Sequence, residues 1–122
     1  MNLISNAIQA MPGGGRLRIS VREHIDRARQ NKSISVSVCD TGSGVKTEHA
    51  RHLFEPFFTT KAAKGTGLGL WISRGIVQKY DGSIRFRSIV HRGGPVTCFR
   101  VTIPLRTSPR RFNSEMPQSM SA

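Results

Sequence analysis

A glycine-rich run near the middle of the chain, Gly65-Thr66-Gly67-Leu68-Gly69, comes directly before an amphipathic stretch. From Leu70 to Tyr80 apolar residues recur largely at helical spacing, and Asp81-Gly82 ends the pattern. We therefore expect a helix over 70–80 whose N-terminal backbone N–H groups could hold an anion such as a phosphate. The run fits neither the phosphate-loop nor the dinucleotide-binding fingerprint, and an ordinary glycine-rich linker is the alternative.

Two pairs of alternating segments flank this loop and helix. Alternation of apolar with basic or hydroxyl side chains predicts half-buried strands over 16–22, 33–39, 83–90 and 96–105. The last two are joined by 91–95, which predicts an antiparallel hairpin. Residues 24–32 are polar and charged, so we expect a solvated connection there that could include some helix.

The remaining segments complete a simple order of elements. Residues 2–11 predict a helix that Pro12-Gly13-Gly14-Gly15 ends, and 47–53 could form a short helix. Helix, two strands, loop, helix and two strands together predict an α+β layered sandwich. With 122 residues the chain suits one domain, expected over 1–105. Residues 106–122 lack periodicity and predict a disordered tail rich in Ser, Pro and basic residues.

The charge of the chain makes anionic partners candidates. Lys and Arg number 19 against 7 Asp and Glu, a formal net charge of +12, which favours nucleic acid, phosphates or anionic membranes. A nucleic-acid binder would concentrate its basic residues on one element, yet here they are spread from Arg16 to Arg111. We therefore expect no nucleic-acid partner.

Other sequence features limit where in the cell the chain is expected and what chemistry its cysteines could carry. No run approaches the roughly 18 apolar residues of a spanning helix, and the first residues lack the basic and apolar blocks of a signal peptide. We expect a cytoplasmic chain without a membrane segment. Cys39 and Cys98 stand alone in apolar, strand-like runs, and we interpret them as small buried hydrophobes without chemistry.

Two further segments carry candidate binding residues. Asn2 and Asn6 are four residues apart, so both amides project from one helix face, and an amide oxygen is a plausible Mg²⁺ ligand beside a triphosphate. Asp40 follows a strand and precedes Gly42 and Gly44, where bare backbone lets a flat ligand approach a carboxylate that accepts hydrogen bonds. Taken alone, the two amides are typical of a solvated helix face, and the segment from Asp40 to Gly44 is typical of a turn.

In combination these segments are far more specific. They resemble, in order, the N, G1, F and G2 boxes of the sensor histidine kinase ATP-binding domain, at residues 2–7, 40–44, 53–61 and 65–70. Gly93-Gly94 with Thr97, Phe99 and Pro104 resembles the closing hairpin of that family, so the likeness spans about residues 2–105. Within the family the chain is most similar to kinases of the nitrogen-regulation and dicarboxylate-sensing type. The wider superfamily includes gyrase, Hsp-type chaperone and mismatch-repair ATPases.

The resemblance implies a two-layer sandwich of the Bergerat type, with a mixed, mostly antiparallel sheet and helices on one face. It also implies ATP and Mg²⁺ as ligands. Asn6 would bind the Mg²⁺ ion and Asn2 would lie near the phosphates. Asp40 would bind the adenine amino group, Gly42 would make room for the base, and Thr97 is a weaker candidate for an adenine-side contact.

The same resemblance assigns a lid and a phosphate site. Residues 44–65, beginning at Gly44, would be a mobile lid over the nucleotide. Its anchors would be Phe54, Phe57 and Phe58. Lys61 would neutralise phosphate charge. Backbone contacts to the phosphates would come from the second glycine-rich segment, Gly65, Thr66, Gly67, Leu68 and Gly69.

The chain also departs from the family pattern. None of its four histidines is followed by the acidic residue that marks the family's phosphate acceptor, so the acceptor would lie on a separate dimerisation domain. The resemblance then implies a protein-histidine kinase module that acts, indirectly, on a response regulator. The alternative is a catalytically silent nucleotide-binding fragment or regulator that docks on an intact kinase. Family members also precede the first box with strand and helix, so the first strand or strands would be missing here.

Overall fold

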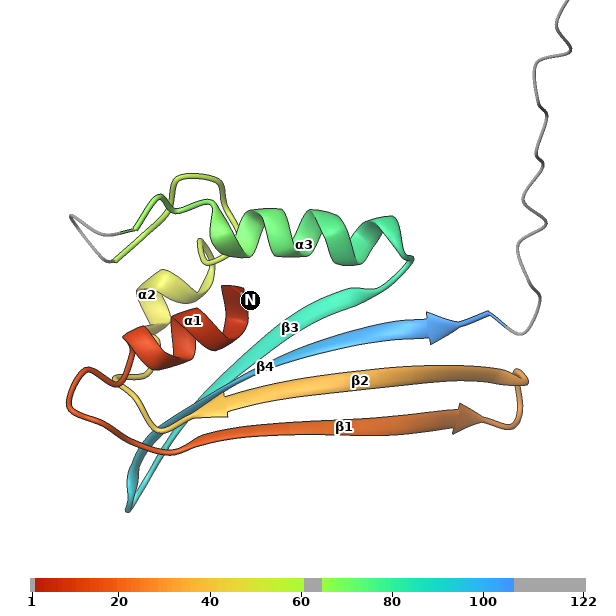
Figure 1. Cartoon of the computed structure of the whole chain (residues 1–122), viewed down its shortest axis with the longest axis horizontal. Coiled ribbons are helices and arrows are strands. Elements are labelled where there is room, and N and C mark those ends of the chain that lie inside the picture. Colours follow the sequence, from red (N-terminus) through yellow and green to blue (C-terminus); the bar gives the residue numbers. More distant parts are fainter. Residues whose placement is uncertain (1, 61–64, 107–122) are drawn as a thin grey trace, which may run out of the picture.

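The computed structural model describes residues 2–60 and 65–106. Within these ranges three helices and four strands follow one another in the order that Figure 1 shows. The elements are α1 (Asn2–Gln9), β1 (Leu17–Asp26), β2 (Asn31–Asp40), α2 (Thr47–Ala50), α3 (Gly69–Lys79), β3 (Ser83–His91) and β4 (Gly94–Leu105).

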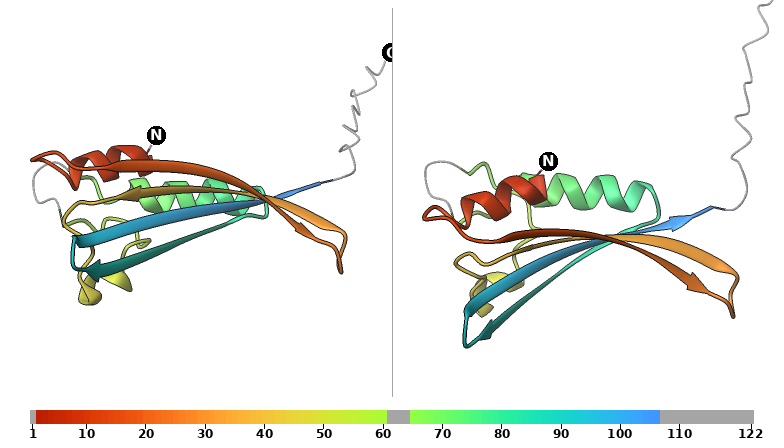
Figure 2. Two further views of the ribbon diagram at one scale, coloured as in Figure 1. Left: turned by 90° about the horizontal axis from the view of Figure 1, so that it is seen from below. Right: turned by 60° about the horizontal axis from the view of Figure 1, so that its bottom comes forward.

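The four strands form one sheet in the order β1-β2-β4-β3. All three ladders are antiparallel, so the sheet consists of two hairpins joined through β2 and β4. Figure 2 shows α1 and α3 on the same face of this curved sheet, and no helix of residues 2–60 and 65–106 covers its other face. The predicted two-layer α+β architecture is confirmed. Within 2–60 and 65–106, no helix is both long enough and apolar enough to cross a membrane.

The core lies between the helices and the central strands. Its buried apolar side chains are Ala7 of α1, Val77 of α3, and Val38 and Phe99 of the sheet. Because side chains alternate along a strand, β2 and β4 present Val38 and Phe99 as neighbours on the helix side. Phe99 also lies 5.8 Å from the ring of Phe86 on β3, so the aromatic contacts extend the core toward the edge of the sheet.

The connection expected over 24–32 is a tight hairpin, and no helix forms there. β1 continues to Asp26 and β2 begins at Asn31, with the carboxylate of Asp26 accepting the N–H groups of Ala28 and Arg29 at 3.1 and 3.2 Å. This end of the hairpin extends beyond the helices (Figure 1). Its strands are therefore solvated on both faces, and they lack the apolar alternation by which a sequence shows a strand.

The interpretation of the two cysteines as isolated, inert side chains is wrong. Cys39 on β2 and Cys98 on β4 are direct cross-strand partners and form a disulfide. They are 59 residues apart in the sequence. Only the antiparallel register of β2 against β4 brings them together, and the spacing of the cysteines along the chain does not reveal that register.

Candidate functional site

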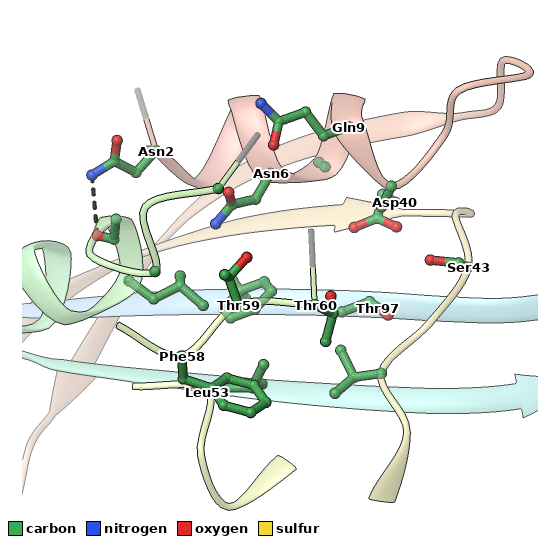
Figure 3. A pocket seen from close by; sticks show the side chains of 18 of the residues that line it. Asn2, Asn6, Gln9, Asp40, Ser43, Leu53, Phe58, Thr59, Thr60 and Thr97 are labelled. Carbon is green, nitrogen blue, oxygen red and sulfur yellow. Dashed lines mark hydrogen bonds between the residues drawn. The ribbon is translucent and has the colours of Figure 1, made fainter. Parts of the chain in front are cut away.

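A pocket of about 500 Å³ lies where α1, the ends of β2 and β4, and the start of α3 meet. Figure 3 shows polar side chains reaching into it from several of these elements. The segments expected to form a site lie far apart in the sequence, and the fold brings most of their residues together here. Those that line the pocket are Asn2, Asn6, Asp40, Gly44, Phe58, Gly65, Thr66, Gly67, Gly69 and Thr97.

Asp40 is the last residue of β2, and alternation turns its side chain to the helix side of the sheet. The residue is only 4% exposed, and one carboxylate oxygen accepts the backbone N–H of Gly42 at 2.9 Å. Burial raises the pKa of the Asp40 carboxyl above its usual value, and the hydrogen bond from Gly42 opposes part of that rise. The pocket wall thus contains a desolvated acceptor that a ligand N–H group could satisfy.

Thr97 lies directly across the ladder from Asp40 and is likewise 4% exposed. Its hydroxyl is 3.1 Å from that of Ser88 on β3, which in turn accepts the backbone N–H of Val45 at 3.2 Å. These bonds connect β4, β3 and the segment after Gly44. The same end of the pocket therefore has a carboxylate and a positioned hydroxyl on adjacent strands.

The amide of Asn2 connects the first helix to the glycine-rich segment. Its Nδ2 donates to the carbonyl oxygen of Gly69 at 3.1 Å and to the Ser73 hydroxyl at 3.2 Å. Ser73 itself donates to the Gly69 carbonyl at 2.8 Å. These contacts hold the start of α3 against α1, at the end of the pocket opposite Asp40.

Asn6 lies one turn further along α1, and Figure 3 shows its amide directed into the pocket between Asn2 and Asp40. In the part of the chain that the structure describes, no group of three or more His, Cys, Asp or Glu side chains could hold a metal ion. An amide oxygen such as that of Asn6, together with water and ligand phosphates, is a ligand set of the kind that a Mg²⁺ ion could take. Mg²⁺ accepts such a ligand set because it is bound by few protein groups in phosphate sites.

The glycine-rich segment approaches the aromatic segment before it at Gly67. The φ of Gly67 is +71°, and a Cβ at this position would overlap the backbone of Phe57. Glycine is therefore required here for both conformation and space. Gly65, Gly67 and Gly69 all line the pocket, and α3 begins at Gly69, so main chain rather than side chains faces the ligand space.

Two residues expected to bind ligand do not line the pocket. Leu68 is the residue before α3, where its N–H meets the Thr66 hydroxyl at 3.4 Å. Gly42 packs against the end of α1, because a Cβ there would lie 2.5 Å from the carbonyl oxygen of Ala10. The structure gives Gly42 a packing reason as well as its N–H bond to Asp40. Lys61 falls outside the described residues, as does the expected tail after Arg106.

The three phenylalanines expected as lid anchors differ in their contacts. Phe54 packs 6.4 Å from both Phe86 and Phe99, and the guanidinium of Arg74 lies 5.7 Å from its ring centre. Phe58 lines the pocket. Phe57 is 76% exposed and does not pack against the sheet or the helices as expected, because its φ of +66° turns the chain there.

Sequence reasoning did not select several residues that line the pocket. Gln9 follows Asn2 and Asn6 at the next helical position on the same face, so the amide spacing could have revealed it. Ser43 lies within the expected turn. The others are mostly apolar, and they are Ala7, Ala10, Val45, Leu53, Thr59, Thr60, Leu70 and Phe99.

Comparison with known proteins decides the family. Residues 1–107 match the family model described as "Histidine kinase-, DNA gyrase B-, and HSP90-like ATPase". The chain belongs to this ATPase family. Its relatives include Sporulation kinase D of Bacillus subtilis, 40% identical over 108 residues, and the signal transduction histidine-protein kinase AtoS of Escherichia coli, 36% identical over 97 residues. These alignments cover 88% and 80% of this chain but only 19% and 15% of the two kinases.

Solved structures of the family share the fold. The mycobacterial sensor histidine kinase MprB superposes with a TM-score of 0.70 at 28% identity, covering 84% of this chain and 65% of that one. The catalytic domain of histidine kinase ThkA gives 0.63 at 35% identity, covering 84% and 62%. Full-length ShkA in complex with AMPPNP gives 0.67 at 26% identity, covering 88% and 20%. The ATPase chain described here is thus similar to the catalytic part of sensor histidine kinases.

Proposed function

We propose that this chain is the ATP-binding catalytic module of a two-component sensor histidine kinase. The observation that carries the proposal is the polarity of the pocket. One end has the buried Asp40 carboxylate, and the other has the glycine-rich backbone at the start of α3. A nucleotide has the matching polarity, with hydrogen-bond donors on its base and negative charge on its phosphates.

At the base end, the Asp40 carboxylate accepts a hydrogen bond from the adenine amino group. The Thr97 hydroxyl is its adenine-side neighbour, since the two residues face each other across β2 and β4. Gly42 keeps the turn after β2 close to α1, and Gly44 leaves the approach to the base free of side chains. Both residues thereby shape the space beside the carboxylate.

At the phosphate end, backbone N–H groups between Gly65 and Gly69 donate hydrogen bonds to the phosphate oxygens. Asn2 holds this segment in place through its bond to Gly69, and Lys61 adds positive charge. Asn6 is the residue that would hold Mg²⁺, which neutralises phosphate charge when bound. Positioning and charge neutralisation are the main tasks that phosphoryl transfer sets a protein.

The proposed reaction transfers the γ-phosphoryl group of ATP to a ring nitrogen of a histidine on a separate dimerisation domain. A nitrogen–phosphorus bond forms, the bond to the β-phosphate oxygen breaks, and ADP leaves. The phosphohistidine then supplies a response regulator. This places the module in the cytoplasm, where ATP is available.

Titration of MgATP into the wild type, Asp40→Asn and Asp26→Asn tests the site. Asp26 is a matched control, because it lies in the β1–β2 hairpin away from the pocket. We expect calorimetry to show at least a tenfold loss of affinity for Asp40→Asn, since hydrogen bonds to charged groups contribute about 1.5–3 kcal/mol. The control should match the wild type. Equal affinities of all three proteins, or no binding by the wild type, would contradict the proposal.

A second experiment tests the chemistry. Incubation of the chain with ATP labelled in the γ-phosphate and a purified acceptor-histidine domain should label that domain. The Asp40→Asn variant should label it more slowly at limiting ATP. Nucleotide binding without any transfer would instead support the alternative of a silent nucleotide-binding regulator.

A further inference from the structure

The face of the sheet turned away from the helices gathers arginines from three strands. Alternation and register place the side chains of Arg18 and Arg22 from β1, Arg85 and Arg87 from β3, and Arg100 from β4 on this face. All five are exposed. We call this surface the arginine face. It is the side of the sheet that no helix covers in Figure 2.

The side-chain contacts agree with this assignment. The Arg100 guanidinium donates to the hydroxyl of Ser37 at 3.2 Å, and His24 lies 2.8 Å from the hydroxyl of Ser35. Both serines lie on the same face of β2 as Cys39. On this face, β2 therefore presents serine hydroxyls between the arginines of β1 and those of β4 and β3.

The five arginines are close together without acidic partners. None of them takes part in the ion pairs found among residues 2–60 and 65–106. The acidic residue that alternation puts on this face is Asp26, at the far end of β1 beside Arg29. Strand geometry places Arg85 and Arg87 about 7 Å apart and sets Arg18 about 14 Å from Arg87 across the sheet. Like charges at these spacings repel one another and attract an anionic partner.

One row of the arginine face has an apolar middle. Arg18, Cys39, Cys98 and Arg87 form one row across the four strands, so the disulfide lies between two guanidinium groups. Beside it is a hollow of about 680 Å³ whose lining includes Val96, Arg16 and His91. An apolar patch flanked by charged side chains fits the general anatomy of a protein–protein interface, in which apolar contacts are bordered by polar ones.

We propose that the arginine face docks an acidic protein surface, in which Asp and Glu side chains surround one apolar side chain that enters the hollow beside the disulfide. Arginine suits this role because its planar guanidinium pairs with carboxylates through two hydrogen bonds. The partner carboxylates neutralise the rim, and the apolar side chain covers Val96 and the disulfide.

Other anionic partners match this face less well. Within the described part of the chain this face carries no Phe, Tyr or Trp on which bases could stack, because Phe86 of β3 and Phe99 of β4 point to the helix side. A broad sheet face also lacks the helix or ribbon that reads a DNA groove. Among the described residues, Ile89 beside Val96 is the one large apolar side chain exposed on this face, which is less than the apolar surface that a protein buries in a lipid layer.

The test uses a labelled synthetic peptide composed of Glu and Asp with a single central Leu, titrated with the chain at low and physiological salt. The double variant Arg18→Ser/Arg87→Ser removes two charges beside the hollow. The matched control Arg27→Ser/Lys79→Ser removes two exposed charges away from both this face and the pocket. We expect the first variant to lose about tenfold in affinity and the control to stay within about twofold of the wild type. Both should bind MgATP like the wild type, which shows that the fold is intact.

Four outcomes would overturn the proposal. The wild type could fail to bind the peptide, or both double variants could lose affinity equally, which would leave net charge as the only cause. Replacing the central Leu by Ser could leave affinity unchanged, which would remove the apolar contact. Tighter arginine-dependent binding to duplex DNA or to phosphatidylserine vesicles than to the peptide would assign the face to another class of partner.

Discussion

At the scale of single residues, the buried carboxylate of Asp40 is expected to lower the stability of the fold and to contribute to ligand binding. Its carboxylate is desolvated by the end of β2 and the pocket walls, and one N–H group, that of Gly42, compensates part of that cost. A ligand amino group would add a second donor. The same side chain is thus expected to weaken the empty fold and to strengthen the bound state.

The pH dependence of stability tests the first half of this statement. Because burial raises the pKa of folded Asp40 above its usual value of 3.8, the folded state binds this proton more tightly than the unfolded chain. Stability should therefore rise as the pH falls through the raised pKa toward 3.8. Asp40→Asn lacks this group, so it should be more stable than the wild type at neutral pH. Urea unfolding of both proteins across this range should show the gap closing in acid, and a constant gap would contradict the assignment.

Gly67 is the second residue whose identity the fold requires. Gly67→Ala should lower the free energy of unfolding by at least about 1–2 kcal/mol, because a side chain is disfavoured at φ +71° and its Cβ would meet the Phe57 backbone. Gly75→Ala is the matched control, since nothing lies within 4 Å of its added Cβ in α3. That control should gain about 0.5–1 kcal/mol. Denaturant unfolding distinguishes the two, and equal effects would argue against the close approach.

At the scale of elements, the disulfide links the two central strands. In the chain-entropy account, closing the loop between Cys39 and Cys98 stabilises the fold by about 4 kcal/mol. In a reducing compartment the same two residues stay side by side as thiols. The state of this pair therefore changes stability without requiring any change in the strand register.

Guanidinium unfolding with and without dithiothreitol measures that contribution. The oxidised wild type should be more stable than the reduced protein by up to about 4 kcal/mol. The variant Cys39→Ser/Cys98→Ser should not respond to the reductant. A wild type whose midpoint is the same in both conditions would show that the bond is absent or without effect.

The elements differ in how far the sequence predicts them. Helix α3 was predicted to within one residue at each end, because its apolar spacing and the flanking glycines agree. The ends of β1 and β2 were missed, because they are solvated on both faces. The disulfide and the arginine face were missed for a common reason: alternation indicates which residues share a face of one strand, but not which strands become neighbours. Of the site, the four boxes were predicted, whereas the exposure of Phe57 depends on a backbone turn.

At the scale of the whole molecule, the core is small. The buried apolar residues of the described ranges are four, and large apolar side chains such as Ile8 of α1 and Ile19 and Val21 of β1 stay exposed. A chain with so little burial depends more than a large domain does on what it binds.

Ligand-linked stabilisation follows from this. If MgATP binds only the folded chain, a concentration one hundred times the Kd should raise the free energy of unfolding by about 2.7 kcal/mol. Thermal unfolding should shift upward accordingly, and Asp40→Asn, with a tenfold weaker Kd, should gain only about 1.4 kcal/mol at the same concentration. An equal shift in both proteins would place the nucleotide elsewhere.

Alternate residues of the same strands form the two faces of the sheet, and this limits which changes of sequence each strand can accept. On β2 and β4, Asp40 and Thr97 face the pocket, whereas their immediate neighbours Cys39 and Cys98 face the other way. Substitutions can therefore alter one surface and spare the other. An insertion or deletion of one residue within either strand would exchange the two sets. Insertions and deletions are therefore tolerable only in the turns. Both faces of the sheet depend on the number of residues in each strand staying the same.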